Sequence, residues 1–216
     1  MNLEPIIIGM NKHGRFGKYG EKKRIERLRQ SRSVQGQMQM KGISSPRKAS
    51  HNKDKASSIT RVTTRPARPS DVDYIRSLSK KVFHQYGPYE IMLPRWFEAV
   101  ITVTLLALLG KKPVGFAMFT HPVKTWGFPW ACELLAIAVE PERQGHGKGD
   151  LLLSEIERMA KDLGIKKMVL HTGVENMPAQ KLFRKHGFVP AQIKMDFYPE
   201  GQDALMMSKD LSPNNA

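Results

Sequence analysis

The chain of 216 residues has little cysteine, a shortage of acidic groups and no long apolar run. Cys132 is its single cysteine, which excludes an internal disulfide framework and favours a reducing compartment. No apolar stretch approaches the length of a transmembrane helix, and Ile6–Ile8 is too short for the core of a signal peptide. We therefore expect a cytoplasmic protein without a membrane anchor, with a basic organellar transit peptide as the alternative.

The shortage of acidic groups is concentrated near the N-terminus. Residues 1–59 hold 14 Lys and Arg against 4 Asp and Glu, whereas residues 60–216 hold 21 against 16. Residues 1–59 also contain few apolar side chains, so they cannot bury enough surface to offset the entropy of ordering. We expect a disordered basic extension that either contacts the ribosome, RNA or another acidic surface, or only keeps the chain soluble.

Apolar spacing and turn residues predict an α/β domain after this extension. Ser70 with Asp73 predicts the N-cap of a first helix, Asn176 predicts the cap of a last one, and Gly187 its end. Residues 126–130 are expected to be a connection. The predicted strands cover 59–64, 101–109, 114–121, 132–139, 167–172, 189–197 and 204–209, and the predicted helices cover 70–83, 93–100, 150–163 and 176–187.

Gly145, Gly147 and Gly149 stand at alternate positions between the apolar run 134–139 and a helical pattern. The backbone N–H groups of such a loop can point at an anion, and the dipole of the following helix favours negative charge there. A strand, a glycine loop and a helix in this order therefore predict a nucleotide-binding site.

Two common nucleotide motifs do not fit this loop. The phosphate loop of ATPases ends in Gly-Lys-Ser or Gly-Lys-Thr, but here Gly149 follows Gly147 and Lys148. The dinucleotide fingerprint needs a later third glycine and an acidic residue after a second strand, and the strand expected over 167–172 carries none.

The spacing of Gln144, Gly147 and Gly149 matches Gln/Arg-x-x-Gly-x-Gly/Ala, and on this motif the chain resembles the GNAT superfamily of acetyl-CoA-dependent N-acetyltransferases. Two later blocks extend the resemblance. Residues 176–188 read Asn-x-x-Ala-x-x-Leu-Phe-x-x-x-Gly-Phe, similar to the second half of the family's cofactor-binding region. Residues 197–207 are similar to the tail of RimI-type ribosomal-protein N-terminal acetyltransferases.

The resemblance implies a GNAT domain over residues 60–211, with a mixed central sheet flanked by helices. It implies direct acetyl transfer from acetyl-CoA to a primary amine, without a metal or a covalent nucleophile. In the family the central strand splays from its neighbour and lends backbone amides to the cofactor. The implied cofactor-binding residues are Leu135, Ala136, Ile137, Val139, Gln144, Gly145, His146, Gly147, Lys148, Gly149, Asn176 and Phe183.

Two residues are candidates for the base that removes a proton from the amine. Glu133 lies eleven positions before Gln144, the spacing of the catalytic glutamate in GNAT histone acetyltransferases. His171 lies where eukaryotic N-terminal acetyltransferases carry a catalytic histidine, and histidine side chains titrate near neutral pH. Each could instead be a satisfied polar residue at the end of a strand, and the sequence leaves the choice open.

Phe183 replaces the family's tyrosine, and a phenyl ring cannot donate a proton to the departing thiolate, so another donor or water must serve. We expect Tyr198 to pack within a hairpin rather than contact substrate, His146 to be exposed, and His186 to lie on the surface. These predictions assign no residue of the protein as the general acid.

The acceptor amine is best matched by a protein N-terminus. An α-amino group has a pKa near 8, against about 10.4 for lysine, so it is the easier nucleophile. Lysines, polyamines and antibiotics are the alternative acceptors, because a fold does not fix a substrate. Two rivals from other classes are a non-catalytic acetyl-CoA-binding regulatory module and a nucleic-acid-binding protein with an α/β scaffold.

Overall fold

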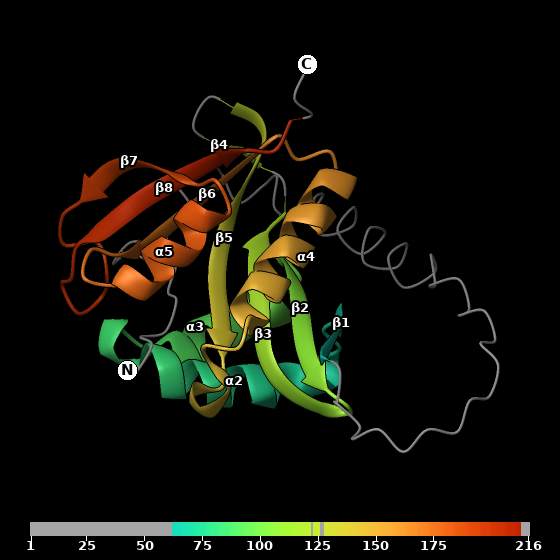
Figure 1. Cartoon of the computed structure of the whole chain (residues 1–216). Helices are drawn as coiled ribbons and strands as arrows, with labels where there is room; N and C mark the ends of the chain where they lie inside the picture. The colour runs from blue at the N-terminus through green and yellow to red at the C-terminus, as the bar shows by residue number, and fades with distance from the viewer. Residues whose placement is uncertain (1–61, 122, 126–127, 213–216) are drawn as a thin grey trace.

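The computed structural model describes residues 62–121, 123–125 and 128–212 (Figure 1). The basic extension expected over 1–59 lies outside these residues and stays a prediction. The strands are β1 Val62–Pro66, β2 Thr102–Leu109, β3 Lys112–Thr120, β4 Val123–Thr125, β5 Phe128–Val139, β6 Lys167–Gly173, β7 Val189–Lys194 and β8 Ala204–Asp210. The α-helices are α2 Val72–Phe83, α3 Tyr89–Glu98, α4 Lys148–Asp162 and α5 Met177–Lys185.

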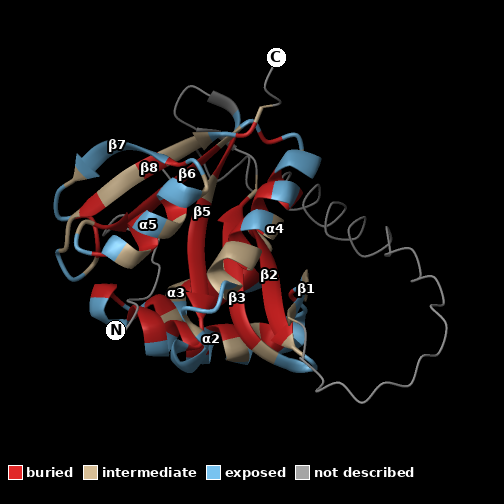
Figure 2. Cartoon of the chain, viewed as in Figure 1, coloured by how far each residue is buried: buried red, intermediate tan, exposed pale blue. Residues whose placement is uncertain are grey.

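The strands form one mixed sheet in the order β1-β2-β3-β5-β6-β8-β7, with β4 pairing β5 outside this path. Only β5 and β6 run parallel; the other recorded pairs are antiparallel. Helices α2 and α3 pack on one face with their own buried cluster, and α4 and α5 pack on the other. Figure 2 shows β2, β3 and β5 buried between these layers. The predicted mixed sheet flanked by helices is confirmed.

A β-bulge at Leu135 changes which side chains of β5 face which layer. Leu134 pairs with Phe119 and Ala136 pairs with Met118, so Leu135 is the extra residue on β5. Leu135 and Ala136 consequently both join the α2/α3 cluster, although side chains normally alternate along a strand. The bulge lets the first half of β5 place Glu133 toward α2 and α3.

Four sequence predictions about local structure were wrong in part. Asp71 is the N-cap residue of α2, but its carboxylate accepts from Arg68 N at 2.6 Å and so caps the 3-10 turn Pro69–Asp71 before the helix; Ser70 and Asp73 do not cap α2. Helix α3 begins at Tyr89 rather than residue 93, since it tolerates Pro94 in its interior.

The predicted connection over 126–130 is also wrong where the structure describes it. Phe128 already belongs to β5, because β4 pairs with this part of the strand. Trp130 lies within this strand and has a φ of 68°, a left-handed conformation that is rare for a bulky residue. Strand β7 ends at Lys194, earlier than the predicted residue 197.

Gly115 lets β3 approach its neighbours closely. A Cβ at this position would lie 2.7 Å from the carbonyl oxygen of Ala138 and 3.3 Å from Leu152 Cδ1 on α4. Backbone on one side and a packed helix on the other leave no room for the methyl group.

We expect Gly115→Ala to lower the free energy of unfolding by about 1–3 kcal/mol, because it overpacks the contact between β3, β5 and α4. Urea denaturation followed by circular dichroism would measure this. Ala191→Val on the exposed strand β7 is the control and should change stability by no more than about 0.5 kcal/mol. Equal stability of Gly115→Ala and the wild type would contradict the close approach.

Candidate active site

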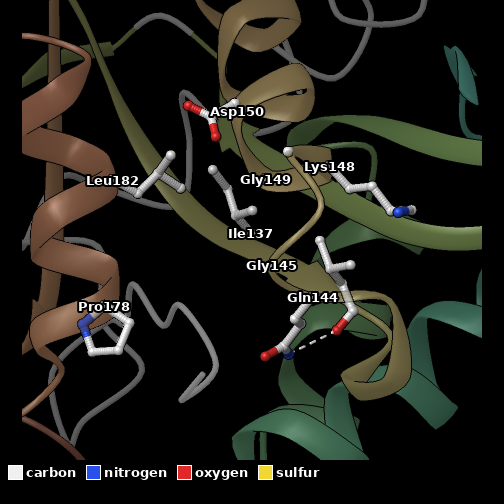
Figure 3. A pocket seen from close by; sticks show the side chains of 10 residues that line it. Ile137, Gln144, Gly145, Lys148, Gly149, Asp150, Pro178 and Leu182 are labelled. Atoms are coloured by element: carbon white, nitrogen blue, oxygen red, sulfur yellow. Dashed lines mark hydrogen bonds between the residues drawn. The ribbon is translucent and has the colours of Figure 1, made fainter. Parts of the chain in front are cut away.

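The glycine loop and the start of α4 form one wall of a pocket on the α4/α5 side of the sheet (Figure 3). Gly145 and Gly147 have φ values of 75° and 74°, and Gly147 is the N-cap of α4. A Cβ added at Gly147 would meet nothing within 4 Å, so the space in front of the loop is open. The pocket is lined by Ile137, Val139, Gln144, Gly145, Gly147, Lys148, Gly149, Asp150, Pro178 and Leu182.

This pocket fits the parts of acetyl-CoA. Left-handed glycines at a helix N-terminus turn backbone N–H groups toward an anion, as a diphosphate requires. Ile137, Val139 and Leu182 supply an apolar wall beyond the loop, suited to a pantetheine arm. Among the residues that the structure describes there is no cluster of three or more His, Cys, Asp or Glu able to hold a metal ion.

The side chains of Gln144 and His146 make hydrogen bonds to backbone carbonyl oxygens of the loop and of the strand before it. Gln144 Nε2 donates to the carbonyl oxygen of Val139 at 3.0 Å, the dashed contact in Figure 3. His146 is exposed, as expected, and its Nδ1 lies 2.6 Å from the carbonyl oxygen of Gln144. The loop therefore offers backbone groups to an anion while these side chains fix its shape.

Asp150 places a carboxylate in this pocket, where a lysine and a histidine contact it. Lys185 Nζ lies 2.6 Å and His186 Nε2 lies 3.2 Å from Asp150 Oδ1. The hydrogen bond from Lys185 is the main cause that lowers the pKa of Asp150. Asp150 is therefore held charged within an ion pair that joins α4 to α5, the two helices beside the pocket.

The prediction that His186 lies on the surface was wrong. Its side chain is 12% exposed and lies between Asp150 and Glu157, with Nδ1 3.5 Å from Glu157 Oε1. Lys209 on β8 completes the group at 2.6 Å from Glu157. Sequence position could not show this, because the partners come from α4 and β8.

The central strand separates from its parallel neighbour beside the pocket. The pairing of β5 with β6 covers Ala131–Leu134 against Lys167–Leu170, although β5 continues to Val139 and β6 to Gly173. Figure 1 shows the two strands diverging from that point. The splay implied by the family resemblance is thus present.

The implied cofactor-binding residues of β5 lie on the diverging segment. Ile137 and Val139 line the pocket, whereas the side chains of Leu135 and Ala136 are buried toward α2 and α3. A backbone role is open to Ile137 and Val139, because alternate residues of an antiparallel strand turn their N–H and C=O groups to opposite edges and Glu140, in phase with Ala136, donates to Val114 on the β3 side. The implied role of Leu135 and Ala136 stays a prediction.

Glu133 and His171, the two candidate bases, contact each other. His171 Nδ1 lies 2.9 Å from Glu133 Oε1, and the two side chains are 3% and 24% exposed. The imidazole stacks on Phe197 at 4.5 Å between centroids. His171 Nε2 is buried and has no hydrogen-bond partner within the described part of the chain. The sequence offered these residues as alternatives, and the structure joins them.

The β3–β5 ladder and the bulge hold Glu133 in place. Its backbone N–H donates to Thr120 Oγ1 at 2.9 Å, just beyond the last ladder pair. His171 and Glu133 both face the α2/α3 layer, opposite the glycine-loop pocket, because their strand neighbours Leu170 and Leu134 face α4 and α5. The splay between β5 and β6 therefore separates a cofactor side from a second side that holds the pair.

Tyrosines surround the pair on this second side. Tyr89 is fully buried, its hydroxyl has no hydrogen-bond partner among the described residues, and burial followed by the charge of Glu133 raises its pKa. Tyr86 and Tyr198 pack ring to ring at 4.7 Å. The packing role expected for Tyr198 agrees with its complete burial.

Two loops meet above this side. Gln202 Nε2 donates to the carbonyl oxygen of Gln85 at 2.6 Å, and a Cβ at Gly87 would lie 2.7 Å from Pro199. Sequence reasoning missed Tyr89 and this contact, since it brings together segments more than a hundred positions apart and no local pattern marks it.

Phe183 and Asn176 lie beside the pocket without lining it. Phe183 is fully buried and packs edge to face on Phe188, while the Asn176 side chain accepts from Ala179 N at 3.1 Å as the predicted cap of α5. Their implied contact with cofactor stays a prediction. The sequence analysis missed the lining residues Asp150, Pro178 and Leu182, of which Leu182 belongs to the recognised block.

The model of the Acetyltransferase (GNAT) family matches residues 72–188. The chain belongs to this family. An N-alpha-acetyltransferase of Saccharolobus solfataricus is 27% identical over 159 residues, covering 69% of this chain and 93% of that protein. A Bacillus subtilis protein named for acetylation of the alanine of ribosomal protein bS18 is 33% identical over 76 residues, covering 35% of this chain and 50% of that protein.

Solved structures show the same fold. The acetyltransferase yncA from Salmonella typhimurium, with its cofactor acetyl-CoA, superposes with a TM-score of 0.61 at 21% identity, covering 72% of this chain and 96% of that chain. Arabidopsis thaliana NAA60 with a bisubstrate analogue gives 0.60 at 15% identity, covering 69% and 98%. This GNAT protein is therefore an acetyl-CoA-dependent N-acetyltransferase, and the resemblance drawn from its motifs is confirmed.

We expect Gly147→Asp to weaken CoA binding at least tenfold, because a carboxylate in front of the loop repels the diphosphate. Gly147→Asn is the matched control, since asparagine tolerates a left-handed φ and adds no charge. Isothermal titration calorimetry of both variants with CoA would compare them. If Gly147→Asp and Gly147→Asn weakened CoA binding equally, a change in backbone geometry at the loop would explain the loss, and the added charge would not.

Proposed function

We propose that this GNAT enzyme acetylates the α-amino group at the N-terminus of a protein. The observation that carries the proposal is the pair of a buried His171 and a partly exposed Glu133 beside the splay, on the face opposite the glycine-loop pocket. The amine approaches the pair from the α2/α3 side, where the Glu133 side chain is partly exposed, while acetyl-CoA occupies the α4/α5 side. The two substrates then meet between β5 and β6.

His171 acts as the base in this proposal, and Glu133 positions it. With a proton on Nδ1 donated to Glu133, Nε2 keeps a lone pair and takes the proton of the amine through a water, because Nε2 itself is buried. Bound acetyl-CoA supplies an already activated thioester. Backbone N–H groups of the diverging β5 segment donate to its carbonyl oxygen. Phe183 donates no proton, so water or another donor serves the thiolate.

A protein N-terminus fits a single histidine base better than a lysine does. An α-amino group is partly unprotonated near pH 8, whereas a lysine ammonium must lose a proton held more than two pKa units tighter. Two archaeal relatives, of Saccharolobus solfataricus and Sulfurisphaera tokodaii, carry the name N-alpha-acetyltransferase, and the aligned region covers 93% and 92% of their lengths. Both observations support the α-amine acceptor.

Thiol release from acetyl-CoA would test this proposal across matched acceptors. The panel contains peptides with a free N-terminus and no lysine, the same peptides blocked at the N-terminus and carrying one lysine, polyamines and aminoglycosides. We expect turnover on the free N-termini alone. His171→Asn and Glu133→Gln should each lower kcat about a hundredfold or more, because proton transfer by a positioned base contributes that much.

Glu98→Gln is the matched control, since Glu98 is an exposed carboxylate at the end of α3. Faster turnover on the lysine peptides or on the small amines would refute a protein N-terminus as the acceptor. If His171→Asn and Glu133→Gln both turned over at the wild-type rate, neither residue would take part in catalysis. Tight CoA binding without release of thiol on any acceptor would favour the regulatory-module reading that Phe183 suggests.

We also propose that the enzyme works in the cytoplasm and that its basic extension contacts the ribosome or RNA. The supporting observations are the single cysteine and the charge of residues 1–59. No helix that the structure describes is both long and apolar enough to cross a membrane. Replacing Lys22, Lys23 and Arg24 by Gln in the full chain should lower co-sedimentation with ribosomes and weaken its salt dependence. Unchanged sedimentation would refute the contact.

A further inference from the structure

A row of residues across three strands brings Lys194 to the face that holds the catalytic pair. Lys194 on β7 pairs with Ala204 on β8, and Ala204 pairs with Gly173 on β6. Side chains of directly paired residues lie on the same face of a sheet. Gly173 is two positions after His171, so Lys194 shares the α2/α3 face with His171.

Phe197 links Lys194 to the pair at close range. Lys194 Nζ lies 5.5 Å from the centroid of the Phe197 ring, and the same ring stacks on the His171 imidazole at 4.5 Å. Burial lowers the pKa of Lys194, and the negative charge of Glu133 acts in the opposite direction. The electrostatic field of the carboxylate thus reaches a partly buried ammonium on the last strand of the sheet.

An acceptor polypeptide must pass this ammonium or come near it. Its α-amino group has to come near the pair, and Phe197 contacts both His171 and Lys194, so the side chains that follow the amine come near Lys194 as well. Ala204 and Gly173 are buried, and the Tyr86 hydroxyl lies over Gly173, so the acceptor comes near Lys194 beside the Phe197 ring and not over these two residues. A carboxylate near the start of the acceptor could therefore approach Lys194 Nζ.

We propose that Lys194 determines acceptor specificity by contacting an Asp or Glu side chain within the first two residues of the acceptor polypeptide. The proposal rests on the N-terminal acetyltransferase function proposed above. A partly exposed ion pair contributes up to about 1 kcal/mol, which is about a fivefold preference. Acceptors with lysine at these positions are disfavoured by the same charge.

The test compares kcat/KM for four peptides that differ in one side chain: Ala-Glu and Ala-Gln starts, and Glu-Ala and Gln-Ala starts. The wild type should prefer the glutamate member of at least one pair by about three- to fivefold, and the preference should shrink in 0.5 M salt, which screens the pair. Lys194→Gln should abolish the preference, Lys194→Arg should keep it, and Lys194→Glu should reverse it.

Lys111→Gln is the matched control, because Lys111 is an exposed lysine in the turn between β2 and β3. It should keep the wild-type preference. A wild type that treats both members of each pair alike, or a preference that survives in Lys194→Gln, would overturn the role of Lys194 while leaving N-terminal acetylation intact. If none of the four peptides were acetylated, the proposed function would fail, and the role of Lys194 with it.

Discussion

The splay between β5 and β6 is the constraint on which the rest of the site depends. Two parallel strands pair for only four residues each, and beyond Leu134 and Leu170 their backbones diverge. Backbone amides on that edge of β5 are then available to a ligand instead of a ladder partner. Because the splay lies in the middle of the sheet, it connects the α4/α5 face, which holds the pocket, with the α2/α3 face. A fully paired sheet would keep the two substrates apart.

The bulge at Leu135 fits the same strand to two tasks. Before the bulge, Glu133 faces α2 and α3, where it contacts His171. After the bulge, Ile137 and Val139 face α4 and α5, where they line the pocket. Without the extra residue the alternation of side chains would run unbroken, and a strand with Glu133 on the α2/α3 face would turn Ile137 and Val139 away from the pocket.

The cofactor half of the site was predictable because its signals are local. Gly145, Gly147 and Gly149 mark the loop by spacing alone, and Asn176 caps α5 as its sequence position indicates. The acceptor half was predictable only as a pair of separate candidates. The contact between the loops at Gln85 and Gln202, the burial of Tyr89 and the position of Lys194 all depend on strand order, which no local pattern encodes.

The sequence by itself predicted an α/β domain and a glycine loop suited to phosphate, because both depend on residues close together in the chain whose spacing is set by helix, strand and turn geometry. Its resemblance to the GNAT superfamily implied the particular fold and the cofactor. Only the tertiary structure decided that Glu133 and His171 contact each other, that His186 lies between Asp150 and Glu157, and that Lys194 shares a face with the pair. These relations join strands and helices far apart in sequence, and their distances follow from how the sheet is ordered and bulged rather than from any single segment.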